Sequence, residues 1–155
     1  MNNTNTPGDR PLVELALTIV RVVAGIIFAG HGAQKLFGAF DGPGLEAIVK
    51  MMGTLGYFVT VGEFFGGLGL IVGFLSRFSA ASLIVIMLGA IVHVHGKNGF
   101  FLQMDMSKSG CEFNVALIGL LLPTLIAGPG RYAIGRLLPF LPKSETTGRP
   151  VIYLE

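Results

Sequence analysis

Eight polar or ionisable side chains lie within or beside long apolar stretches of the sequence, where a charge is costly and usually has a partner. They are His31, Lys35, Glu63, His93, His95, Asn98, Glu112 and Asn114. Imidazole, ammonium and amide groups donate hydrogen bonds, and carboxylates accept them or carry protons. If the stretches cross a membrane, all eight groups lie in its outer half. This asymmetry predicts a polar ligand pocket there, with structural ion pairs between helix ends as the alternative.

Two charges lie inside the apolar stretches themselves. Arg21 precedes His31 by ten residues, or about 15 Å along a helix, and shares a seven-residue spacing with Phe28 and Lys35. Glu63 is the only formal charge between Tyr57 and Leu75. Two explanations stay open for Glu63: a functional carboxylate, or one half of a structural ion pair with Arg21 or a histidine.

The sequence offers little support for a metal or nucleotide. His93 and His95 differ by two positions and point about 200° apart on a helix, so we expect no zinc or copper site. His31 and His93, on different helices at similar depth, could hold a haem b, which is a minor alternative. With one cysteine, Cys111, and no nucleotide-binding glycine motif, redox chemistry would need a cofactor, a quinone or a partner chain.

The composition indicates that the membrane itself positions these groups. The 155 residues are 52% hydrophobic and 13% charged, with a mean hydropathy of +0.70, whereas a soluble domain carries about 25% charged residues. We predict an all-α integral membrane four-helix bundle. Its single domain covers residues 1–138, with spans at about 12–36, 57–75, 78–96 and 112–128, followed by a tail over 139–155. The net charge of +2 is too small to indicate a nucleic-acid partner.

Charge and linker patterns predict the orientation of this bundle. The loops on the side of the termini hold six Lys and Arg residues, against four on the other side, so both termini are expected in the cytoplasm. The N-terminus lacks a basic n-region, which predicts that the first span is retained. Leu45, Ile48, Met52 and Leu55 share a helical face in the first linker. They predict a short amphipathic helix at the outer interface.

Several motifs resemble the DoxX-like family of small membrane proteins. These motifs are RVVAGIIFAGHGAQKLFG, GEFFGGLGLIVG, FLSRFSA, HVHGKNGFF and GCEFNVALIGLLL before GPGR. The resemblance covers about residues 21–136 and implies a compact four-helix bundle in the bacterial cytoplasmic (inner) membrane. Some members are subunits of a thiosulfate:quinone oxidoreductase, which implies a redox role. The matching positions are Arg21, His31, Lys35, Glu63, His93, Asn98 and Glu112.

The residues and the resemblance together favour a redox subunit that binds a quinone in the outer half of the bundle, within a redox complex or a homo-oligomer. The expected ligand-binding residues are Arg21, His31, Lys35, His93 and Asn98. Glu63 and Glu112 are the expected proton carriers. Phe28, Phe64, Phe65 and Phe100 are expected to pack on the ring. The alternatives are a non-catalytic membrane anchor or assembly subunit of an oxidoreductase complex, and a small transporter.

Overall fold

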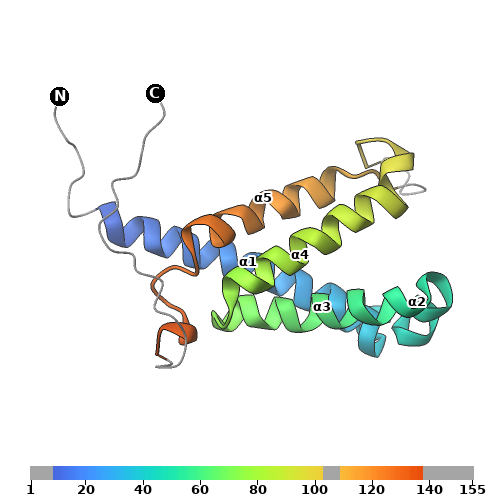
Figure 1. Ribbon diagram of the computed structural model, residues 1–155, viewed down its shortest axis with the longest axis horizontal. Helices are drawn as coiled ribbons and strands as arrows, with labels where there is room; N and C mark the ends of the chain where they lie inside the picture. Colours follow the sequence, from blue (N-terminus) through green and yellow to red (C-terminus); the bar gives the residue numbers. More distant parts are fainter. Residues whose placement is uncertain (1–8, 103–108, 138–155) are drawn as a thin grey trace.

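The computed structural model describes residues 9–102 and 109–137, where every regular element is helical (Figure 1). The long helices are α1 Asp9–Phe37, α3 Thr54–Val72, α4 Ser76–Ala90 and α5 Glu112–Ala127. The short helix α2, Gly44–Met52, lies between α1 and α3. Shorter turns are formed by Ala39–Asp41, Ile91–His95, Gly96–Asn98 and Ile134–Leu137. The predicted all-α bundle is confirmed.

Three of the helical segments are long and apolar enough to cross a bilayer. They are Arg10–Phe37, Thr54–Val72 and Ser76–Asn98, with mean hydropathies of 2.3, 1.6 and 2.0. The apolar helix α5 has 16 residues, or about 24 Å, somewhat less than the ~30 Å hydrocarbon core. Large apolar side chains such as Ile26, Val85 and Ile126 lie on the outside of the bundle. This surface contacts the lipid bilayer.

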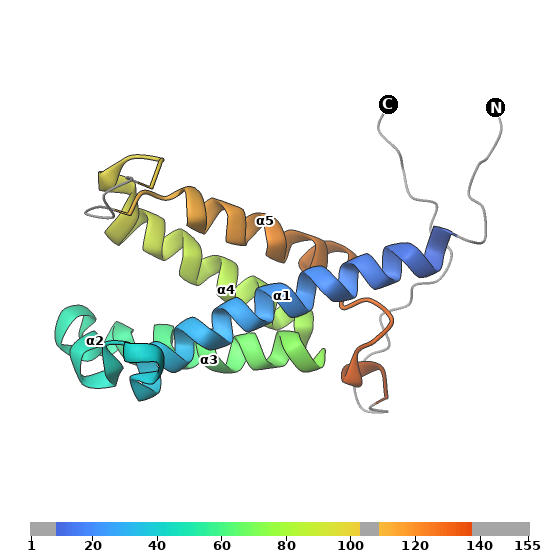
Figure 2. The ribbon, with the colours of Figure 1, turned by 180° about the vertical axis from the view of Figure 1, so that it is seen from behind.

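The helices form two pairs, α1 with α3 and α4 with α5, which diverge towards the end that carries α2 (Figures 1 and 2). We call this end the α2 end. The core between the pairs is apolar in its middle. Its buried members are Ala24, Phe28, Leu70, Ala80, Leu83, Met87, Leu117 and Leu121. Side chains that face the core near the α2 end therefore lie where the two pairs separate.

Glycines hold α1 directly against α3. A Cβ on Gly32 would clash with the backbone nitrogen of Phe64, and one on Gly67 would clash with that of Ala29. Such contacts allow two backbones to touch, as is common for helices packed within membranes. We call these contacts of Gly32 and Gly67 the glycine seam. The seam fixes the relative height of α1 and α3, and hence which side chains of α1 can reach α3.

Candidate functional site

The most buried charge at the α2 end is Glu63, which pairs with Lys35. The Lys35 Nζ lies 2.6 Å from Oε1 and 2.5 Å from Oε2 of the carboxylate. The Glu63 side chain is 3% exposed and that of Lys35 is 27% exposed. The partner of Glu63 is thus Lys35, not Arg21 or a histidine as the sequence suggested. Charged hydrogen bonds of this length are short and strong in apolar surroundings.

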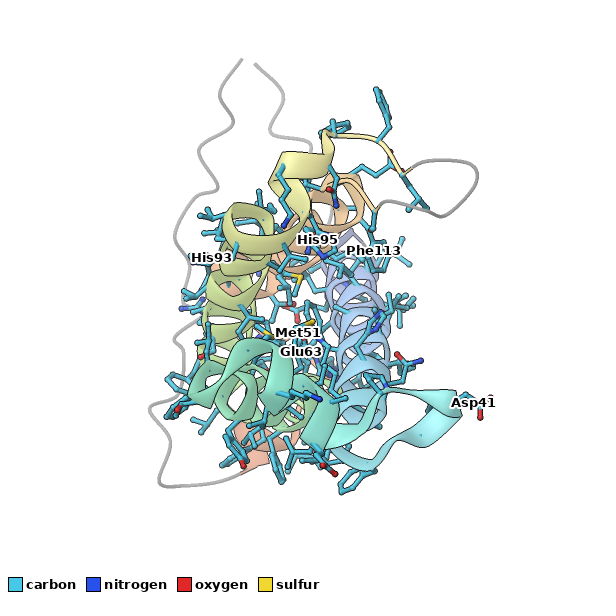
Figure 3. The ribbon with its side chains drawn as sticks, turned by 90° about the vertical axis from the view of Figure 1, so that its right-hand side faces the viewer. Asp41, Met51, Glu63, His93, His95 and Phe113 are labelled. Carbon is cyan, nitrogen blue, oxygen red and sulfur yellow. The ribbon has the colours of Figure 1, made fainter. Side chains whose placement is uncertain are left out.

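The glycine seam explains why these two side chains meet. Lys35 follows Gly32 by three residues on α1, so both lie on the face of α1 that packs on α3. Gly32 contacts the backbone of Phe64, the residue directly after Glu63. Figure 3, seen from the α2 end, places Glu63 near the centre of the bundle. The carboxylate therefore faces the interior, and the longer Lys35 side chain reaches it from nearer the helix end.

This arrangement leaves hydrogen-bonding capacity beside the pair. An ammonium group has three donors, and two of those of Lys35 are used by the two oxygens of Glu63. One N–H remains on a side chain that is partly exposed. The pair can therefore donate to the carbonyl oxygen of a ligand without breaking. Further towards α5, Asn114 is also buried and donates to the Met87 sulfur at 3.4 Å.

Three other residues of the predicted polar group form hydrogen bonds in the loop between α4 and α5. His95 Nδ1 and Asn98 Nδ2 each lie 3.1 Å from the carbonyl oxygen of Ser109. Glu112 Oε1 accepts a hydrogen bond of 2.9 Å from the Leu102 backbone. We call His95, Asn98 and Glu112 the loop cluster. Five of the eight predicted polar residues of the outer half therefore form two separate groups, the Lys35–Glu63 pair and the loop cluster.

The loop cluster borders a shallow recess of about 440 Å³. Its lining residues are Leu102, Ser109, Glu112, Phe113 and Ala116. Lys35 and Glu63 do not line this recess. Glu112 thus takes part in loop structure and in the recess wall, away from the ion pair.

Arg21 lies at the opposite end of the bundle. Its side chain is buried, and Nη1 donates to the carbonyl oxygens of Leu70 and of Ile71, the latter at 3.2 Å. Nη2 donates to the carbonyl oxygen of Tyr132 at 2.6 Å. Leu70 and Ile71 are in the last turn of α3, where carbonyls lack the usual donor four residues on, and Leu70 also accepts from the Gly73 backbone at 3.3 Å. Arg21 therefore caps α3 and fastens the segment after α5 to it.

The two candidate haem ligands are not brought together. The ring of His31 packs on that of Phe113, with centroids 6.1 Å apart. His93 is exposed, and Figure 3 shows it on the far side of α4 from Phe113. Within residues 9–102 and 109–137, no group of three or more His, Cys, Asp or Glu side chains could hold a metal ion.

The expected ring-packing aromatics are also divided. Phe28 is buried in the core, and Phe100 packs on Phe101 in the loop. Phe64 packs edge-on against Phe65 and against Phe37, each with centroids 5.2 Å apart. Phe64 follows Glu63 directly, so its side chain points about 100° away from the carboxylate. The Phe64 ring and its aromatic neighbours therefore lie on a different face of α3 from the Glu63 carboxylate.

Comparisons with known proteins point to one family. The family model described as DoxX matches residues 16–96. The chain is also 28% identical over 134 residues to the inner membrane protein YqjF of Escherichia coli (strain K12). This alignment covers 83% of the chain and 96% of YqjF. No solved structure matches the chain.

Proposed function

Since the chain belongs to the DoxX family and is a multi-pass protein of the inner membrane, we propose that it is a quinone-interacting subunit of a redox system. The observation that carries this proposal is the buried pair of Lys35 and Glu63 between the diverging helix pairs. A bound quinone would supply the two-electron chemistry that the side chains lack. We assign the ligand contact to this pair, and not to Arg21, because Arg21 lies at the opposite end of the bundle, where both of its Nη groups donate to backbone carbonyls.

The two side chains have complementary roles in this proposal. Lys35 would donate its remaining N–H to a ring carbonyl oxygen, which holds the ring beside the pair. When the reduced form, the quinol, is bound, the Glu63 carboxylate would accept a proton from its ring hydroxyl, because Glu63 lies within reach of the same ligand. The surrounding apolar side chains exclude water and strengthen both contacts. The loop cluster would close the α2 end rather than bind the ring.

The pair should govern quinone affinity. Replacing Lys35 by Met should lower the affinity for decylubiquinone at least ~10-fold. The reason is that a hydrogen bond to a charged group contributes about 1.5–3 kcal/mol, and 1.4 kcal/mol is tenfold. Binding is measured by equilibrium dialysis on protein in lipid nanodiscs. Native quinone is identified separately, by solvent extraction of the purified protein.

The matched control is Lys50→Met, the same substitution at an exposed lysine of α2. It should leave the affinity unchanged. Binding is normalised to folded protein, and Glu63→Gln provides a second variant that alters the pair. Wild-type affinity in both pair variants would contradict the proposal.

We also propose that the α2 end faces the periplasm, as the distribution of Lys and Arg predicts. The single cysteine makes this testable, because Cys111→Ser removes all thiols. In that background, Lys97→Cys should react with a membrane-impermeant maleimide in intact cells. Arg10→Cys should react only after the membrane is opened. Lys97 and Arg10 are both exposed, so the opposite labelling pattern would show the inverted orientation.

An assembly subunit without its own quinone is the second candidate. It is favoured by the segment after α5, which Arg21 and a hydrogen bond from Gly135 N to Gly73 O fasten to the bundle. This fixed segment presents the exposed side chains of Tyr132 and Ile134. A purified protein that lacks quinone but retains an oxidoreductase partner would favour this candidate.

A further inference from the structure

Thr60 is a buried hydroxyl without a hydrogen-bond partner among the described residues. Its side chain is fully buried on α3, yet Oγ1 bonds to no protein atom in these parts of the chain. A threonine within a helix can bond to the carbonyl one turn earlier, as Thr18 does to the Glu14 oxygen at 2.9 Å. Thr60 does not. An unmade hydrogen bond in an apolar interior is costly, so its retention calls for a reason.

The position of Thr60 suggests that reason. It belongs to the buried face of α3 that also contains Glu63, three residues and about 4.5 Å further along the helix. In the other direction this face reaches Gly56, which packs on Ile48 of α2. Thr60 therefore lies on the α2 side of Glu63, the side from which Lys35 reaches the carboxylate. The hydroxyl is thus within one turn of α3 of the carboxylate that would contact a ligand.

We infer that Thr60 provides the third polar contact of the site formed by Lys35 and Glu63, binding a ring oxygen of the quinone. This inference rests on the proposed function. The ammonium only donates hydrogen bonds and the carboxylate only accepts them, whereas a hydroxyl does both. Thr60 can therefore donate to the carbonyl oxygen of a quinone and accept from the hydroxyl of the corresponding quinol. It would help the site hold both redox forms.

Thr124 provides a matched comparison. It is also buried, its Oγ1 also lacks a partner within the described residues, and it lies in the last turn of α5. That turn is near the end opposite α2, because Arg77 at the start of α4 donates to the Ile126 carbonyl. An unpartnered hydroxyl alone therefore does not indicate contact with a ligand held by Lys35 and Glu63. Within the described residues the buried hydroxyls without a partner are those of Thr60, Ser76 and Thr124, and of these three only Thr60 lies on the α3 face that holds Glu63.

The test compares isosteric variants. Thr60→Val should lower the affinity for both decylubiquinone and its quinol about twofold to tenfold, the value of one neutral hydrogen bond. Thr60→Ser, which keeps the hydroxyl, should bind decylubiquinone with an affinity within about twofold of that of the wild type. Thr124→Val should bind with the wild-type affinity. Without quinone, Thr60→Val should melt at the same or a higher temperature, because a buried unpartnered hydroxyl has been replaced by a methyl group.

The outcomes of this test distinguish failure of the role of Thr60 from failure of the proposed quinone-binding function. If Thr60→Val binds normally while Lys35→Met and Glu63→Gln bind weakly, the role of Thr60 is refuted and the proposed function stands. If Thr60→Val and Thr124→Val weaken binding equally, the effect is general packing and the inference also fails. Normal binding in all variants at the pair and at Thr60 would refute both proposals.

Discussion

Replacing Arg21 by Met is expected to lower the free energy of unfolding by about 3 kcal/mol or more. Three carbonyl oxygens lose a charged donor, and each such bond contributes about 1.5–3 kcal/mol. Removing a buried charge offsets part of this loss. The cation also lies at the C-terminus of α3, where it is favoured by the helix dipole. The expected decrease in melting temperature in detergent is roughly 10 °C.

Arg77→Met is the control for this experiment. Arg77 also donates to a helix-terminal carbonyl, that of Ile126 at 3.1 Å, but it is exposed. Its replacement should cost less than about 1 kcal/mol. Arg21→Lys should be intermediate, because an ammonium group cannot match the fork of a guanidinium that reaches carbonyls from two segments. Equal melting temperatures for Arg21→Met and Arg77→Met would contradict the capping role.

The fold could be predicted from hydropathy because lipid imposes a simple requirement. Apolar segments of this length must satisfy their backbone internally, so they become helices. The predicted short helix in the first linker is observed as α2, since Ile48 packs against the bundle at Gly56. Helix ends were less predictable. Beyond Ala90 the chain continues through the π-helical turn Ile91–His95, which has no distinctive residue pattern.

The site was only partly predictable, for a related reason. Spacing gives the depth and face of a side chain, and these placed Lys35 and Glu63 correctly in one half of the bundle. It does not reveal backbone acceptors, because every residue has a carbonyl group. The partners of Arg21, His95 and Asn98 are all such carbonyls. The sequence therefore predicts Arg21 as a ligand-binding residue, with pairing to Glu63 as an alternative, whereas in the structure Arg21 caps a helix.

Thr60 was missed although the sequence contains a usable signal. It is a polar residue in an apolar span, three positions before Glu63 and on the same helical face. The predicted site consists of ionisable groups and amides and contains no hydroxyl. What the sequence could not provide is that this hydroxyl lacks the local bond that Thr18 makes. That fact depends on the orientation of one side chain.

Replacing Lys35 by Met should cost about 3–5 kcal/mol of unfolding free energy, because it leaves the buried Glu63 without its counter-ion. Glu63→Met should cost less, since the partly exposed Lys35 can turn its ammonium towards the interface. The double variant should recover much of the stability, because two apolar side chains can replace a buried ion pair at little cost. The free energy of unfolding of all four proteins in this double-mutant cycle is measured in mixed micelles.

The pattern of the cycle also bears on function. The same cycle at the exposed Glu46 and Lys50 of α2 should show a coupling of only about 0.2–0.5 kcal/mol. If the Lys35/Glu63 double variant is stable but has lost quinone binding, the pair is retained for its ligand and not for the fold. If instead the double variant unfolds as readily as Lys35→Met, the pair is a structural link. The polar chemistry of the α2 end would then have to be assigned to other side chains.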